Sequence, residues 1–199
     1  MKKYLTIFCL LCIFGCISYL FWYSDWKYSL PTPVPLAYHA VIEGDHIDLK
    51  GKFNPGKNKP LFLHFFNPDC PCSRFNMPHF KSLADKYGEQ INFAVVVMTS
   101  NKSYTTEKIQ AKYDLTIPVL SDTSLATSCG VYSTPQAVLL NKDLTLYYRG
   151  NYNRTRYCTV QKSNYAQMAI EALLGKKQEP LFNEYALKAY GCSLPGCKK

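Results

Sequence analysis

Residues 61–73 read Leu-Phe-Leu-His-Phe-Phe-Asn-Pro-Asp-Cys-Pro-Cys-Ser, and this stretch decides the fold. Residues 61–66 form a nearly continuous apolar run, which is typical of a strand buried on both faces of a sheet. The run stops at the turn-forming residues 67–69. An amphipathic pattern then covers residues 72–87 and ends at Gly88. The sequence therefore predicts a central strand that leads into a helix, with two cysteines at the junction.

Strand and helix patterns alternate after this junction. Buried strands are predicted at residues 91–98 and 117–120, with a helix at residues 105–113 between them. A strand hairpin and a closing helix follow at residues 135–140, 144–148 and 164–174. This order predicts an α/β fold in which helices flank a mixed β-sheet.

The N-terminal segment predicts a transmembrane helix. Residues 4–23 carry no charge and are long enough to cross a hydrocarbon core, and Lys2 and Lys3 precede them. Positive charge before the span places the N-terminus in the cytoplasm and the remainder outside. A cleaved signal peptide is disfavoured by the bulky aromatic end of the run, and lipidation of Cys16 by the apolar residues that follow it. We expect a single-pass inner-membrane protein with its domain on the periplasmic side.

The chain divides into four predicted parts. Residues 1–24 are the transmembrane anchor, and residues 25–59 are a linker and N-terminal extension, whose first part has the prolines of an extended spacer. Residues 60–176 form the folded domain. Residues 177–199 are a cysteine-containing C-terminal tail, with one further helix predicted at residues 181–189.

The formal net charge is +9, which raises the question of nucleic-acid binding. The Lys and Arg residues are scattered singly or in short pairs, and they form no basic helix or zinc-finger spacing. Nucleic acid is therefore not an expected partner.

The site motifs resemble those of the thioredoxin superfamily, and within it the membrane-anchored redoxin-like proteins of the bacterial envelope. Pro78 lies eight residues after Cys70, where thioredoxins have a proline in the active-site helix. Thr134 and Pro135 stand where the superfamily has a Thr-Pro pair, with a cis proline, facing the site. The resemblance covers about residues 60–175. It implies a thioredoxin-like fold and thiol–disulfide oxidoreductase activity on protein thiols or disulfides.

Three positions depart from the superfamily pattern. Ser73 stands where the second cysteine of Cys-x-x-Cys is usual, and Cys72 comes one place earlier. His64 replaces a buried carboxylate, and Asp69 replaces the aromatic residue before the first cysteine. The redox potential and the direction of electron flow therefore cannot be transferred from the superfamily.

Cys70 is the predicted nucleophile. A thiolate attacks disulfides, and the unpaired N–H groups and dipole of a helix N-terminus favour an anion there. Cys72 is close enough in sequence to resolve a mixed disulfide formed by Cys70. Cys129 and Cys158 are the alternative resolving cysteines.

Two further residues are candidates for catalytic roles. His64, if it lies beneath the cysteine, would exchange the thiol proton near neutral pH, or it is a hydrogen-bonded core histidine. Pro135, if cis, would present the backbone of Thr134 to an extended polypeptide.

Cys192 and Cys197 flank a Pro-Gly turn, which predicts a structural disulfide between them, with an electron relay as the alternative.

No cofactor or resident metal is expected from this reading. The competing functions are a copper chaperone of thioredoxin fold that uses cysteine and histidine ligands, a thiol peroxidase, and an interaction module without redox activity.

Overall fold

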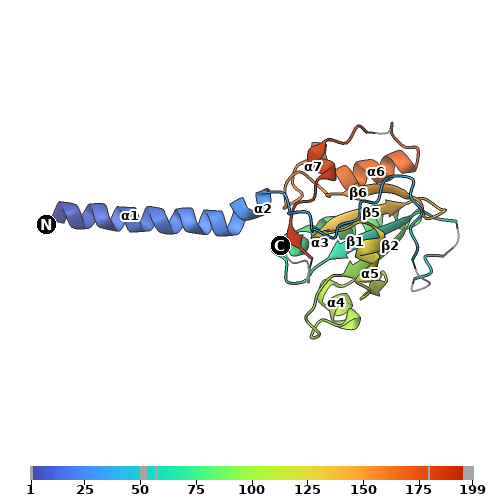
Figure 1. Cartoon of the computed structure of the whole chain (residues 1–199), viewed down its shortest axis with the longest axis horizontal. Helices are drawn as coiled ribbons and strands as arrows, with labels where there is room; N and C mark the ends of the chain where they lie inside the picture. Colours follow the sequence, from blue (N-terminus) through green and yellow to red (C-terminus); the bar gives the residue numbers. More distant parts are fainter. Residues whose placement is uncertain (1, 50–52, 57, 179, 195–199) are drawn as a thin grey trace.

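A computed structural model describes residues 2–49, 53–56, 58–178 and 180–194. Its centre is a five-stranded sheet with the strand order β3-β2-β1-β5-β6 (Figure 1). β1 is parallel to β2, and β2 to β3, whereas β5 is antiparallel to β1 and to β6. The strands span Leu61–Phe66 (β1), Asn92–Val97 (β2), Val119–Leu120 (β3), Gln136–Leu140 (β5) and Leu146–Gly150 (β6). The predicted mixed sheet of thioredoxin type is confirmed.

Helices cover both faces of this sheet. The core on one face is formed with α3, α4, α6 and α7, and the core on the other face with α5 and part of the N-terminal extension. The helices span Pro71–Tyr87 (α3), Thr106–Tyr113 (α4), Ser124–Ser128 (α5), Tyr165–Leu173 (α6) and Glu184–Leu187 (α7). A 3₁₀ turn, η2, covers Gln161–Ser163.

Strand β1 is apolar throughout because both of its faces are buried. Phe62 and Phe66 pack into the core beside α3, whereas Leu63 and Phe65 point to the opposite core beside α5. All four side chains are fully buried. Each contributes about 1.5–3 kcal/mol relative to an exposed side chain. The central strand thus holds the two layers together and ends at the cysteine junction.

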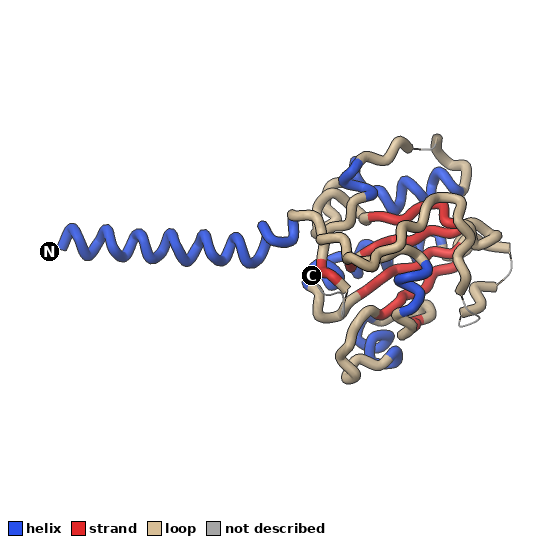
Figure 2. Tube along the Cα trace, viewed as in Figure 1, coloured by secondary structure: helices blue, strands red, loops and turns tan. Residues whose placement is uncertain are grey.

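A long helix precedes the domain and projects away from it (Figure 2). α1 spans Lys2–Phe21, and the helical path continues through a π-helical turn, η1, at Trp22–Trp26 into α2 at Lys27–Ser29. By length and composition Lys2–Trp26 is able to cross a membrane, and none of its apolar window is buried within the chain. This is consistent with a single-pass membrane anchor.

The first part of the linker, in which the prolines predict an extended spacer, contacts the domain at Thr32 and Tyr38. The Thr32 N–H donates to the Ala189 carbonyl at 2.8 Å, and Tyr38 Oη donates to the Gly130 carbonyl at 3.1 Å. Ile47 is buried in the core beside α5. Pro31 forms a bridge with Tyr190, whereas Val34 and Leu36 remain exposed to solvent. The domain boundaries drawn from the sequence stay predictions.

Candidate active site

The turn between β1 and α3 is tied together by Asn67 and Ser73. The Asn67 N–H donates to Ser73 Oγ at 3.3 Å, and Asn67 Oδ1 accepts from the Asp69 N–H at 2.9 Å. The Cys70 N–H donates to the Asn67 carbonyl at 3.1 Å. Ser73 is fully buried. Its hydroxyl therefore accepts a hydrogen bond from the backbone directly after β1. Ser73 thus has a structural role at the position where the superfamily has a second cysteine.

Cys70 is the N-cap residue of α3, immediately before Pro71. Its sulfur is bonded to Cys192, with 6.1 Å between the two Cα atoms, and only 2% of Cys70 is exposed. The same sulfur lies 3.5 Å from the Thr134 carbonyl oxygen. When the bond is reduced, the helix N-terminus favours the thiolate form of Cys70.

The Thr134–Pro135 peptide bond is cis, which confirms that expectation. Thr134 belongs to the two-residue strand β4 (Ser133–Thr134), which pairs antiparallel with β7 (Cys192–Ser193). Thr134 is the register partner of Cys192. The backbone edge expected to receive a polypeptide is therefore occupied by the chain's own C-terminal segment.

The predicted disulfide between Cys192 and Cys197 is wrong in this structure, because the Cys192 sulfur is bonded to Cys70. Cys197 lies outside the described residues. Sequence reasoning missed the partner of Cys70, since 122 residues separate the two cysteines and no local pattern links them.

The other candidate cysteines are thiols in separate surroundings. Cys129 is fully buried in the core beside α5, and burial raises its pKa to about 12 although Arg149 opposes this. Cys158 packs against the opposite core. Burial raises its pKa to about 11, against a hydrogen bond from Asn76 Nδ2 at 3.0 Å. Neither thiol is poised to be a thiolate near neutral pH.

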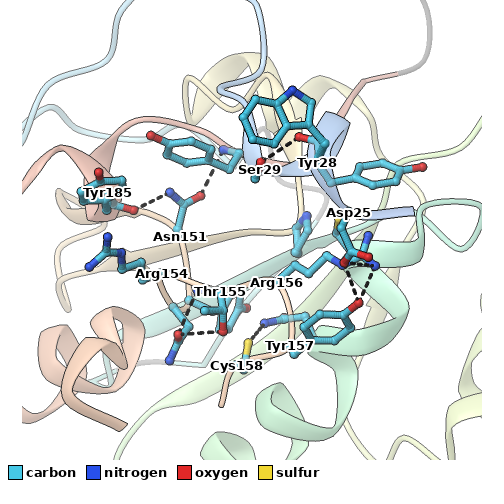
Figure 3. Close-up of a pocket in the computed structure, with 18 of the residues that line it drawn as sticks. Asp25, Tyr28, Ser29, Asn151, Arg154, Thr155, Arg156, Tyr157, Cys158 and Tyr185 are labelled. Carbon is cyan, nitrogen blue, oxygen red and sulfur yellow. Dashed lines mark hydrogen bonds and ion pairs between the residues drawn. The ribbon is translucent and has the colours of Figure 1, made fainter. Parts of the chain in front are cut away.

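Cys72 and Cys158 both line a cavity of about 400 Å³ between the end of the N-terminal helix and the domain (Figure 3). Asp25 forms an ion pair with Arg156 at 3.0 Å and accepts a hydrogen bond from Tyr157 Oη at 3.0 Å. The Arg156 guanidinium also lies over the Tyr28 ring, 5.3 Å from its centre. These contacts join the helical anchor segment to the loop that carries Cys158.

His64 lies beneath α3 and is fully buried. Its ring stacks on Phe80 with 4.4 Å between centroids, and its Nδ1 is hydrogen-bonded to Tyr152 Oη at 2.7 Å. Burial, with a contribution from the nearby His79, lowers the pKa of His64 to about 3. The imidazole is therefore neutral at physiological pH, which favours the core-histidine alternative over a proton carrier. Sequence reasoning missed Tyr152, the partner that positions this ring.

Asp69 is turned away from the thiol. Its carboxylate accepts hydrogen bonds from Tyr104 Oη at 3.0 Å and from Thr99 Oγ1 at 3.3 Å. These bonds direct the negative charge toward the loop after β2 instead of toward Cys70.

Comparisons with known proteins agree with this architecture. The family model described as "Domain of unknown function (DUF6436)" matches residues 39–194. The thiol-disulfide oxidoreductase ResA of Halalkalibacterium halodurans is 27% identical over 103 residues, which are 51% of this chain and 56% of that protein. ResA of Bacillus thuringiensis subsp. konkukian is 30% identical over 105 residues, 51% of this chain and 58% of that protein. The chain thus spans somewhat over half the length of these curated relatives.

Two solved structures share the fold. A hypothetical protein from Sinorhizobium meliloti 1021 has a TM-score of 0.63 and 18% identity, covering 79% of this chain and 96% of that one. An uncharacterized conserved protein from Geobacillus kaustophilus has a TM-score of 0.65 and 18% identity, covering 83% and 97%.

Proposed function

The chain belongs to the family described as "Domain of unknown function (DUF6436)", and from this premise we propose that it is a thiol–disulfide oxidoreductase with Cys70 and Cys192 as its redox pair. The observation that carries the proposal is the disulfide at the N-terminus of α3, which faces the cis Thr134–Pro135 bond. The names of the ResA relatives support the same reaction class.

The reaction is two successive thiol–disulfide exchanges. The Cys70 thiolate attacks one sulfur of a substrate disulfide, and the other substrate sulfur leaves as a thiolate that takes up a proton. The Cys192 thiolate then attacks Cys70 Sγ in the mixed disulfide and releases the second substrate thiol. The substrate gains two electrons and the Cys70–Cys192 pair loses them. An external dithiol returns the pair to its reduced form, and the reverse sequence oxidises a substrate dithiol.

We assign the resolving role to Cys192 in place of Cys72, Cys129 and Cys158. Cys192 is bonded to Cys70, and its strand β7 pairs with β4 at Thr134. Cys129 is fully buried as a thiol in the core beside α5.

The substrates in this proposal are exported proteins. The helix Lys2–Trp26 would hold the domain at the periplasmic face of the inner membrane, with Lys2 and Lys3 in the cytoplasm. Protease added to intact spheroplasts should digest the domain, whereas protection of the domain until the membrane is broken would contradict this orientation.

The copper-chaperone alternative receives no support from the described side chains. No group of three or more His, Cys, Asp and Glu residues gathers there in a metal-binding arrangement. No observation specifically favours a peroxidase.

The test of the proposed function is insulin-disulfide reduction by the detergent-solubilised full chain with dithiothreitol as the electron source. Cys70→Ser should abolish the activity, and Cys192→Ser should accumulate a mixed disulfide with substrate instead of turning over. Cys129→Ala is the matched control because it also removes a buried cysteine, and it should retain activity. Full activity in Cys70→Ser would refute the assignment. Cys192→Ser expressed in the host should also trap its exported partners.

A further inference from the structure

The C-terminal strand β7 lies where an extended polypeptide would bind. Thr134 and Ser133 pair antiparallel with Cys192 and Ser193, and the Leu194 N–H extends the ladder to the Tyr132 carbonyl at 3.4 Å. An exposed strand edge offers unpaired N–H and C=O groups that a second strand can satisfy. Here the tail satisfies them and also brings a sulfur to Cys70.

The residue before Cys192 is fitted to this position. Gly191 has a φ of +137°, and a Cβ atom there would overlap the Thr134 carbonyl oxygen and lie 3.3 Å from Ser133 Oγ. Only a residue without a side chain allows the backbone to approach this closely. The close approach of Gly191 therefore sets a steric requirement on any strand that follows the same path.

The tail is also held from its other side. Pro31 forms a bridge with Tyr190, and Thr32 Oγ1 donates to the Gly191 carbonyl at 3.3 Å. Thr32 Oγ1 shares a further hydrogen bond with Ser133 Oγ at 2.9 Å. The tail is thus enclosed between β4 and the segment that follows the membrane helix.

On the basis of the proposed function, we infer that β7, a segment of the chain itself, occupies the polypeptide-binding edge at Thr134. There it competes with a substrate strand whose reactive cysteine follows a glycine. In the oxidised protein the Cys70–Cys192 bond fastens the tail to this edge. In the reduced protein only non-covalent contacts hold the tail, namely its hydrogen bonds and the burial of Leu194, so a substrate strand can replace it.

Resolution and substrate release then become one event. When Cys192 attacks Cys70 in the mixed disulfide, the substrate loses its sulfur bond at the moment β7 takes back the backbone edge. The tail thereby expels the product strand.

The test uses the detergent-solubilised full chain with Cys192→Ser, in which Cys70 is not bonded to residue 192 and only non-covalent contacts hold the tail. The probe is the peptide Lys-Ala-Tyr-Gly-Cys-Ser-Leu, which copies residues 188–194, with its cysteine carried as a mixed disulfide with thionitrobenzoate. Attack by Cys70 on the peptide sulfur releases coloured thionitrobenzoate, so the capture rate is read directly.

Two variants in the Cys192→Ser background loosen the tail. Gly191→Ala and Gly191→Val each add a Cβ atom that blocks the approach of the tail to Thr134, and neither changes the probe peptide. We expect each to capture the peptide at least about five-fold faster, which corresponds to the loss of about one hydrogen bond. Replacing glycine with valine in the peptide should slow its capture by a similar factor.

Capture rates in both loosened variants equal to that of the Cys192→Ser parent, with their circular dichroism unchanged, would overturn the inference. If Gly191→Val fails to fold, the smaller substitution Gly191→Ala decides. If the valine peptide is captured as fast as the glycine peptide, the inference that the tail and the substrate bind the same edge is refuted. Failure of the proposed function has a different readout. It would appear as unchanged insulin reduction in Cys70→Ser, independently of the peptide-capture rates.

Discussion

Tyr152 Oη and His64 Nδ1 form a hydrogen bond of 2.7 Å, although 88 residues separate them in the chain. The bond joins β1, which ends at the active site, to the loop after β6. It holds a neutral imidazole under α3, where a charged group would be costly.

This pair predicts a pH dependence of stability. Burial lowers the pKa of His64 to about 3 from 6.5, so below pH 6.5 the unfolded chain binds a proton that the folded chain does not. The free energy of unfolding should therefore fall as the pH drops from 6.5, by up to about 1.4 kcal/mol per pH unit. Urea unfolding at several pH values gives the slope of the free energy of unfolding against pH. This slope should be shallower in His64→Leu than in the wild type, whereas His39→Leu, at an exposed position, should keep the wild-type slope.

The free energy of unfolding should be measured between pH 4.5 and 6.5, above the pH range in which protonation of Glu171 changes it. Burial would raise the pKa of Glu171, but hydrogen bonds from Lys177, Gln167 and Tyr87 lower it to about 2 from 4.5. The stability that Glu171 contributes is lost below pH 4.5. An unchanged slope in His64→Leu would show that His64 is not the buried neutral group.

The cysteine pairing predicts a specific peptide map. Digestion of the non-reduced protein should yield one linked fragment that contains Cys70 and Cys192. The link should persist in Cys72→Ser and in Cys197→Ser and disappear in Cys70→Ser. A fragment linking Cys192 to Cys197 in the wild type would contradict the structure.

Burial also predicts slow alkylation of two thiols. The pKa values of Cys129 and Cys158 are raised to about 12 and about 11, so at pH 8 their thiolate fractions are at least about a hundred-fold below that of a free cysteine. Iodoacetamide labelling followed by mass spectrometry should leave both unmodified in the folded protein and modify both in denaturant. Rapid labelling of Cys129 in the native state would show that the core beside α5 opens readily.

A close contact at the end of β6 predicts a destabilising substitution. A Cβ atom at Gly150 would overlap the Ala186 carbonyl oxygen and the Tyr148 phenol. Gly150→Ala should lower the free energy of unfolding by about 1–3 kcal/mol, because the packed backbone must shift. Urea denaturation measures this, with the exposed Lys142→Ala as the control. Equal urea midpoints in Gly150→Ala and the wild type would show that α7 can shift without loss of stability.

The parts of the fold that the sequence predicted are those with local signals. β1 is a continuous apolar run because helices bury both of its faces, and Pro78 and the Thr134–Pro135 pair fixed the register of the site. The predicted hairpin and closing helix agree with the structure to within two residues at their ends.

The parts that were missed depend on long-range contacts. β4 and β7 have two residues each, too few for any alternation to be visible in a sequence. The link from Cys70 to Cys192 occurs in three of the fifteen ways of pairing the six cysteines that follow the N-terminal helix, and no local pattern selects it. Tyr152 was overlooked for the same reason, since its contact with His64 arises only when the sheet has formed.

The separation of 122 residues between the bonded cysteines also sets an order of events during biosynthesis. A ribosome makes Cys70 long before Cys192, and all strands of the central sheet lie in the chain before the second cysteine. Until Cys192 has followed, Cys70 can meet only the thiols of other molecules or of nearer cysteines in its own chain. Until Cys192 has been made, the site at the N-terminus of α3 is therefore open to thiols and disulfides of other molecules, and the segment that closes it follows every strand of the central sheet.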